Sequence, residues 1–489
     1  MYKKNRNHQF SLADFNQPMG LKLNPENQWI RKAALIPWDE IEDKYAALFP
    51  SNTGTVAKPL RIALGSLMIQ KEYGFSDRDL IDQIQMNPYF QFFIGMPGYQ
   101  MTAPFSAPLL VEFRKRLSDE VINEINEMII EHNKPEPPAG SSSGKKDEAT
   151  KTKETDNNGT LIVDATCAPQ NISFPQDINL LNEAREDLEE IIDEICYENN
   201  LCKPRMYRDN ARRDYLNLAR SKKRTVKKIR KAIKKQLQYI CRDRGHIDWL
   251  EENGYPASEK QKELLKTIEQ VYAQQKYMYE ENLHTVENRI VSISQPFVRP
   301  IVRGKAAAPV EFGAKLDISI VNGLGRIEKI SFESYNESEM LQDVVERYLD
   351  REGHYPERVL ADKIYRNRKN LQYCKEHGIR LSGPALGRPK KGMHPDRKLE
   401  YIDNADRVEV ERAFSLSKRS FGLGLIRTKL EVTTRGAIAL SILAMNLSKL
   451  AKAFLRQKLE WIFSRYRIKI REIISMDFEN NFGKEAVIA

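Results

Sequence analysis

The chain of 489 residues lacks any uninterrupted apolar run of about 18 residues, the length that suggests a membrane-spanning helix. Its N-terminus, MYKKNRNHQFSLADF, lacks the apolar segment of a secretory signal. We therefore expect no membrane association and a cytoplasmic location. Cysteine is scarce, and none of the five cysteines forms a CxxC pair, so neither a zinc site nor a disulfide framework is indicated. The segment GLGLIRTK lacks the P-loop pattern, which argues against ATP use.

Positive charge is in excess and unevenly distributed. The formal net charge is +10 and the pI is about 9.1, which favours an anionic partner, with double-stranded DNA as the first candidate. Between Lys203 and Lys235 there are fifteen Lys or Arg residues against two Asp residues. Such a block is either a solvated helix or a phosphate-binding surface. Its candidate DNA contacts are Lys222, Lys223, Arg224, Lys227 and Lys228.

Residues 1–132 are predicted to form a helical N-terminal DNA-binding domain. The apolar spacing favours several short helices, and Ser76 before DRDL is a suitable N-cap. Arg114, Lys115 and Arg116 are candidate phosphate contacts. The alternative is that these helices only bury Leu, Ile and Phe against one another.

Composition changes sharply after this region. Residues 133–160 are nearly devoid of apolar side chains, which predicts a flexible linker and a domain boundary. A second domain is expected over 161–455, followed by a C-terminal tail at 456–489. Within it, residues 177–288 have helical periodicity with few breakers and predict a long helical insertion, able to form a hairpin or a coiled-coil arm.

Strand patterns on either side of the insertion indicate an α/β fold. A buried strand at 161–163 is expected to end at Asp164, and a second strand, RVLAD, ends at Asp362. Two β-branched runs flank Asn322-Gly323 and predict an antiparallel hairpin. A strongly apolar helix beginning near 436 is expected to pack across the sheet.

One predicted helix within 403–429 carries a charged face. Offsets of four and seven residues place Arg407, Glu411 and Lys418 on the same side, while Val410 and Ala413 lie on a neighbouring apolar stripe. The ordinary interpretation of such a face is a solvated surface with weak ion pairs. The two strand-end aspartates give it a second interpretation.

Asp164, Asp362 and Glu411 come from separate elements expected to meet at one edge of the sheet. Carboxylate oxygens gathered in this way form the ligand environment that Mg²⁺ prefers, with Mn²⁺ as a substitute. Two such ions suit phosphodiester cleavage. Taken singly, each aspartate is also consistent with a turn cap.

The sequence around Glu411 resembles the bacterial insertion-sequence transposases of the DDE type. Their signature, Y-x2-R-x3-E-x6-K, is matched by Arg407, Glu411 and Lys418, with Asn404 at the Tyr position. The segments LIVDAT around Asp164 and VLADKIYRNRKN around Asp362 resemble two further blocks of the family. The resemblance implies a ribonuclease H-like mixed sheet with flanking helices, behind an all-α N-terminal domain.

The resemblance also implies roles for individual residues. Asp164 would bridge two Mg²⁺ ions, while Asp362 and Glu411 would each hold one. Arg407 and Lys418 would contact DNA phosphates beside the scissile bond. Glu409 competes with Glu411 for the third ligand position, but it lies about 200° away around the helix. The loop LSGPALGRPKKG adds Arg388 as a further candidate DNA contact.

The implied activity is transposition. The protein would bind the terminal inverted repeats of an element, cleave DNA by two-metal hydrolysis and join the 3′-hydroxyl ends to target DNA, acting as a homodimer in the DNA complex. Two alternatives stay open from the sequence. One is a DNA-binding protein with a repurposed or inactive transposase fold, and the other is a ribonuclease H-like nuclease.

Overall fold

The computed structural model describes residues 2–4, 11–16, 22–49, 56–135, 157–302, 310–384, 386 and 396–482, with side chains up to Trp461 except those at 457 and 459. Most of the predicted linker, and Arg388, lie outside the described residues.

The N-terminal region is helical, as expected. Its helices are α1 (Gln28–Ala34), α2 (Trp38–Ala47), α3 (Leu60–Tyr73), α4 (Asp77–Met86), α5 (Pro88–Phe93), α6 (Leu109–Arg116) and α7 (Asp119–His132). The predicted N-cap is confirmed, because the Ser76 hydroxyl accepts a hydrogen bond from the Asp79 amide at 3.2 Å. Trp29, Trp38 and Phe93 pack edge to face within one apolar core.

A mixed six-stranded sheet forms the second part of the fold. Its strands are β1 (Thr160–Pro169), β2 (Arg299–Val302), β3 (Val310–Val321), β4 (Leu324–Ser331), β5 (Arg358–Leu360) and β6 (Arg380–Leu381). The order is β2-β3-β1-β5-β6, with β4 also paired to β3. Strands β5 and β6 run parallel to β1, whereas β3 runs antiparallel to it. The predicted hairpin is confirmed, since Asn322 and Gly323 join β3 to β4 with φ values of 51° and 80°.

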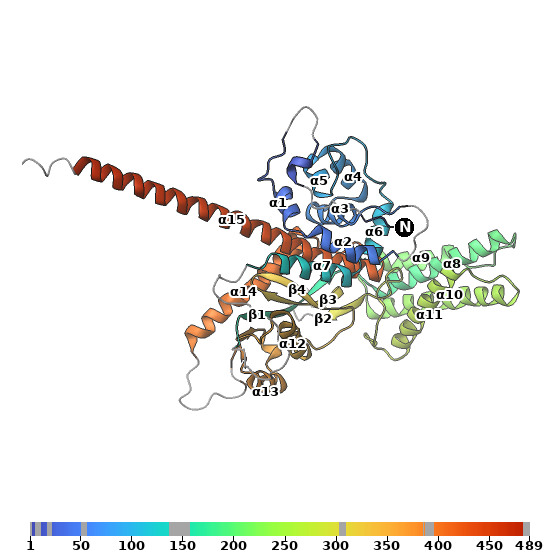
Figure 1. The fold of residues 1–489 in the computed structure, drawn as a ribbon. Coiled ribbons are helices and arrows are strands. Elements are labelled where there is room, and N and C mark those ends of the chain that lie inside the picture. The colour runs from blue at the N-terminus through green and yellow to red at the C-terminus, as the bar shows by residue number, and fades with distance from the viewer. Residues whose placement is uncertain are drawn as a thin grey trace, which may run out of the picture.

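Helices cover both faces of this sheet, which confirms the expected ribonuclease H-like arrangement (Figure 1). On one face, α12 (Leu341–Glu352) and α13 (Arg368–Glu376) bury Val345 and Cys374 with Val163 of β1. On the other, α14 (Arg397–Ser420) and α15 (Glu431–Phe482) bury Val410 and Ile442 with Ile318 of β3. Short 3₁₀ helices, η3 (Glu337–Met340) and η4 (Lys363–Tyr365), precede α12 and follow β5; a third, η1 (Leu12–Asp14), lies near the N-terminus.

The expectation that the first strand ends at Asp164 is wrong. Strand β1 continues to Pro169, so Asp164 lies in its middle. The strand continues because β3 pairs with β1 as far as Pro169. The parallel neighbour β5 pairs only as far as Ile162, so Asp164 lies just beyond the end of that neighbour.

The predicted helical insertion forms an arm of four helices: α8 (Asp177–Glu198), α9 (Arg208–Ala219), α10 (Val226–Glu252) and α11 (Glu259–Glu280). Apolar side chains of α8, α10 and α11, among them Leu188, Ile240 and Ile268, form a separate core. The arm therefore buries its own apolar surface and projects from one side of the sheet (Figure 1).

Helix α15 joins the N-terminal helices to the sheet. Its residues Leu440 and Leu443 belong to the N-terminal core, while Ile442 and Met445 pack in the core of the sheet. Residues Glu431–Arg456 are long and apolar enough to cross a membrane, but 67% of that window is buried within the protein. This burial agrees with the expectation that the helix packs across the sheet. Beyond it the helix extends away from the body of the molecule (Figure 1).

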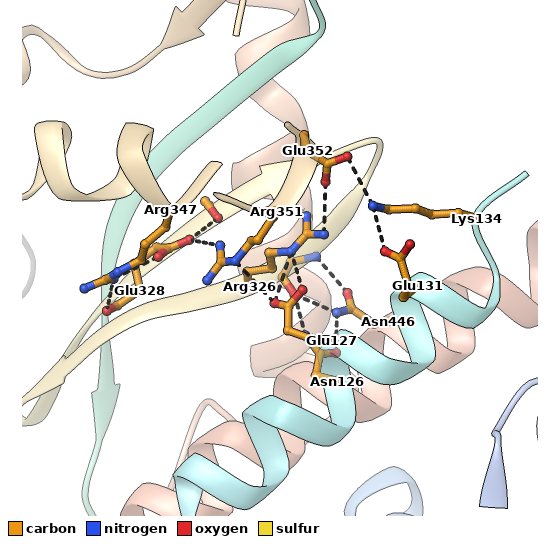
Figure 2. A network of polar contacts seen from close by, with 12 residues as sticks. Asn126, Glu127, Glu131, Lys134, Arg326, Glu328, Arg347, Arg351, Glu352 and Asn446 are labelled. Carbon is orange, nitrogen blue, oxygen red and sulfur yellow. Dashed lines mark hydrogen bonds and ion pairs between the residues drawn. The ribbon is translucent and has the colours of Figure 1, made fainter. Parts of the chain in front are cut away.

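A polar network fastens the N-terminal region to the sheet (Figure 2). Arg326 of β4 is only 3% exposed, and its Nε donates to both carboxylate oxygens of Glu127 on α7, at 3.1 and 2.9 Å. Its Nη2 also contacts Glu352 of α12 at 3.4 Å. Asn446 of α15 donates to Asn126 of α7 at 2.8 Å. The N-terminal helices are thereby held in a fixed position against the sheet.

Candidate active site

Asp164 and Asp362 lie near each other because of the order of the strands. β1 carries Asp164 just beyond the last β1–β5 pair, Ile162 with Leu360, and Asp362 follows β5 by two residues. Asp362 is exposed, and its Oδ1 accepts a hydrogen bond from the Lys363 amide at 2.6 Å, so it also caps η4. Asp362 is therefore a turn cap, as the alternative interpretation predicted, and it still lies at the same edge of the sheet as Asp164.

The third carboxylate comes from α14, which is anchored at two levels. Val410, Ala413 and Ser417 are buried against the sheet and α15. Near the start of the helix, the carboxylate of Asp403 binds Arg358 of β5 at 3.2 Å and Arg380 of β6 at 2.5 Å. These contacts fix the rotation of the helix about its axis.

Arg407 connects the helix to β1. Its Nη2 donates to Oε1 of Glu411 at 3.0 Å, and its Nη1 lies 3.7 Å from Oδ2 of Asp164. The guanidinium therefore lies between two of the three predicted carboxylates. Within the described residues, no three His, Cys, Asp or Glu side chains are gathered closely enough to hold one ion.

The electrostatics of Asp164 indicate a crowded acidic site. Burial raises the pKa of its carboxyl to about 6, and the nearby charges of Glu337 and Asp362 act in the same direction. The Ala165 amide and Arg407 oppose this rise, without cancelling it. A carboxylate that is destabilised by its neighbours is stabilised by a cation, and its oxygen donors suit a hard divalent ion. The chemistry of these oxygen donors thus suits Mg²⁺, but within the described residues they are not gathered closely enough to hold an ion.

Glu337 is an acidic neighbour that sequence reasoning missed. It lies in η3, and its carboxylate binds Lys315 of β3 at 2.8 Å. Asp317, also on β3, is fully buried, and burial raises the pKa of its carboxyl to about 6. Neither residue lies in a segment with a distinctive local pattern, so only the tertiary structure reveals them.

Glu409 occupies a different environment from Glu411. Its Oε1 accepts a hydrogen bond from Lys449 of α15 at 2.8 Å, and Arg412 lies 3.9 Å from the other oxygen. Glu411 is 54% exposed and contacts Arg407. Glu411 therefore lies beside Arg407, whereas Glu409 is held by α15.

The predicted N-terminal DNA contacts do not form one surface. Arg114 is bound by Asp77, at 3.0 Å from Nη1, and by Gln70 at 2.9 Å. Lys115 is exposed and pairs with Glu112 at 3.3 Å. The Arg116 guanidinium lies 5.0 Å from the centre of the Phe49 ring. Only Arg114 faces α14, across a cleft that also includes Lys418.

The basic residues of the arm gather at its base. Lys222, Lys223, Arg224, Lys227 and Lys228 are all exposed, in the turn between α9 and α10 and the first turn of α10. Arg224 donates to Gln176, the N-cap of α8, at 3.1 Å. This turn therefore lies where the arm leaves the sheet.

Comparisons with known proteins agree with this arrangement. The family described as "Transposase DDE domain" matches residues 359–448, a range that includes Asp362, Arg407, Glu411 and Lys418. The family described as "Transposase domain (DUF772)" matches residues 20–116. Asp164 and the arm lie between the two matches.

The chain also resembles one curated protein over part of its length. The uncharacterized protein ORF8 in the nfe locus of Rhizobium meliloti is 25% identical over 174 residues, which are 36% of this chain and 77% of the relative. No solved structure matches the chain. The two family matches occur in the order in which the helical region and the sheet occur in the fold. DDE transposases bind DNA and typically use divalent metal ions. The chain thus combines a match to an N-terminal transposase domain with a match to a DDE transposase domain, the combination found in insertion-sequence transposases.

Proposed function

We propose that this chain is an active transposase that binds the terminal inverted repeats of its element, cleaves the DNA and joins the 3′-hydroxyl ends to target DNA. The observation that carries the proposal is the contact of Arg407 with both Asp164 and Glu411, beside Asp362. The spacing of the family signature and the order of the strands thus lead to the same location. The enzyme would act in the cytoplasm, without ATP, and as a homodimer on DNA.

Asp164, Asp362 and Glu411 are the residues that would hold two Mg²⁺ ions. Bound there, the ions would lower the pKa of the attacking water or hydroxyl and stabilise the leaving oxygen. Arg407 would release the carboxylates as the ions bind and turn toward a phosphate next to the scissile bond, where its planar guanidinium fits two phosphate oxygens. Lys418, on the same side of α14, would hold a second phosphate.

A cleavage assay with matched binding measurements tests this function. A duplex carrying one end of the element is incubated with Mg²⁺ or Mn²⁺ and with the variants Asp164→Asn, Asp362→Asn or Glu411→Gln. Each variant should lose cleavage and strand transfer while still shifting the duplex in a gel. If all three cleave like the wild type, the assignment of the metal site fails.

The same assay separates the two alternatives. Wild-type protein that binds the duplex but never cleaves it would indicate a repurposed fold. Cleavage of RNA·DNA hybrids in preference to element ends would indicate a nuclease.

A further inference from the structure

A cleft separates the N-terminal helices from the end of α14. It has a volume of about 770 Å³. One wall comes from the end of α3, the start of α4 and α6, and includes Lys71 and Arg114. The other wall comes from the end of α14 and the following loop, and includes Lys418 and Arg427. Two family domains that are separate in sequence therefore face each other across this space.

The lining of the cleft is strongly positive. It contains four cations, Lys71, Arg114, Lys418 and Arg427, and a single carboxylate, Asp77, which is bound to Arg114. Within the part of the chain that the structure describes, the Lys71 ammonium and the Arg427 guanidinium have no hydrogen bond or ion pair to another residue. Two charges are thus directed into the cleft without an internal partner.

Lys71 is the less ordinary of the two because its side chain is half-buried. Burial lowers the pKa of its ammonium to about 8, and the positive charge of Arg114 adds to the effect. Burial destabilises the charged form of this ammonium, and among the described residues no internal hydrogen bond or ion pair offsets that cost. A bound anion would stabilise the charged form.

The loop after α14 brings its backbone close to this ammonium. A β-carbon at Gly422 would lie 3.6 Å from Nζ of Lys71, and one at Gly424 would lie 2.7 Å from the carbonyl oxygen of Lys418. Glycine at 424 therefore lets the loop turn back against the end of α14. The loop supports the cleft wall without placing a carboxylate in it.

The cleft adjoins the candidate active site. Lys418 follows Glu411 by seven residues on α14, which is about 10 Å along the helix axis. In a DNA duplex this distance spans about three base-pair steps along one strand. A strand with its scissile phosphate at Glu411 would therefore reach the cleft within a few nucleotides.

We propose that this inter-domain cleft binds the phosphodiester backbone of the DNA that adjoins the active site, with Lys71 and Arg427 as phosphate contacts that join Lys418. The inference rests on the proposed function. It assigns part of the N-terminal domain to the strand that is being cut. The network around Arg326 ties α7 of that domain to β4 of the sheet (Figure 2).

Amine labelling of the wild-type protein tests the contact directly. The full-length protein is treated with an acylating reagent, alone or with a saturating duplex that carries one element end, in the presence of a chelator so that no cleavage occurs. Mass spectrometry should show Lys71 protected several-fold by the duplex. Lys44, an exposed lysine of α2, should keep its labelling rate. Inorganic pyrophosphate replaces the duplex in a further arm, and it should protect Lys71 far less.

Variants provide an independent measurement. Lys71→Gln should reduce the salt dependence of duplex binding by about one unit in the slope of log affinity against log salt, and Lys71→Arg should restore it. Lys44→Gln should leave the slope unchanged. The proposal is overturned if the duplex binds but Lys71 is labelled as fast as without it and the Lys71→Gln slope equals that of the wild type. It is also overturned if pyrophosphate protects Lys71 and the duplex does not. Loss of cleavage in the carboxylate variants is measured separately, so either proposal can fail alone.

Discussion

Arg407 and Glu411 are joined by a hydrogen bond of 3.0 Å across one turn of α14, and the same guanidinium reaches to within 3.7 Å of Asp164 on β1. In the absence of a metal ion, the arginine partly neutralises the carboxylates that are proposed to bind the metal. The contact also orients Glu411 toward β1, whereas Glu409 is turned toward α15.

The two glutamates should therefore differ in function. Glu411→Gln is expected to lower cleavage by at least about a hundred-fold, because it removes a proposed metal ligand. Glu409→Gln removes a half-exposed contact with Lys449, and it should cleave like the wild type and lose less than about 1 kcal/mol of stability. Cleavage rates and urea unfolding check both. If Glu409→Gln lost cleavage and Glu411→Gln kept it, Glu409 would be the third ligand instead.

Gly436 should not tolerate a side chain. A β-carbon there would lie 2.8 Å from the carbonyl oxygen of Leu117, where α15 crosses the loop after α6. Gly436→Ala should destabilise the protein by about 1–3 kcal/mol in urea unfolding, since backbone has to move. Gly245, within α10, has nothing within 4 Å of that position, so Gly245→Ala should be neutral or stabilise by up to about 1 kcal/mol. Equal effects at both glycines would contradict the packing of α15.

The contact between Arg326 and Glu127 should hold the N-terminal helices on the sheet. Arg326→Ala removes a buried cation that serves both Glu127 and Glu352, and it should cost about 2–3 kcal/mol. Limited proteolysis should then cut the N-terminal region faster. Lys44→Ala breaks an exposed pair with Glu124 on the same α7 and should change little. An unchanged proteolysis rate for Arg326→Ala would show that apolar packing alone holds the two parts together.

Asp243 should make the stability of the arm depend on pH. It is fully buried in α10, and neither carboxylate oxygen has a hydrogen-bond partner among the described residues. Burial raises the pKa of its carboxyl to about 7, and Glu189 acts in the same direction, whereas the arginines at 185, 242 and 208 oppose the rise. Since the pKa is higher in the folded than in the unfolded chain, the charged form weakens the fold. The resulting loss of unfolding free energy is absent below about pH 4, where Asp243 is neutral in both states, and complete above about pH 7.

Asp243→Asn should remove that loss. The variant should match the wild type near pH 4 and exceed its unfolding free energy by up to about 4 kcal/mol above pH 7. Urea unfolding from pH 4 to pH 8.5, followed by a probe on the arm, checks this. A difference that does not vary with pH would mean that Asp243 stays charged or stays neutral throughout.

The basic turn at the base of the arm should contribute to DNA affinity. Replacing Lys222, Lys223, Lys227 and Lys228 with Gln should reduce the salt slope of binding by up to about 3–4. Lys260 and Lys262, at the start of α11 and therefore at the other end of the arm, supply the control. Filter binding at several salt concentrations measures both. If the slope falls equally in both variants, the turn has no special role.

Much of the fold follows from local patterns in the sequence. Ser76 caps α4 because its side chain satisfies a free amide at the start of the helix. Asn322 and Gly323 form the turn because both accept positive φ values. The apolar period of α14 places Val410 and Ala413 against the sheet, and the same geometry sets Arg407 beside Glu411. These features depend on interactions within a few residues, so the sequence contains them.

The tertiary structure decided the rest. Asp164 was expected at the end of a strand, but pairing with β3 extends β1 to Pro169. Glu337 approaches Asp164, and Lys71 faces Lys418, only because distant segments pack together. The sequence alone thus indicated the candidate site residues and determined which face each helix buries, while long-range strand pairing and helix packing decided which charges lie close together. Local periodicity cannot encode that choice, because it depends on contacts between residues hundreds of positions apart.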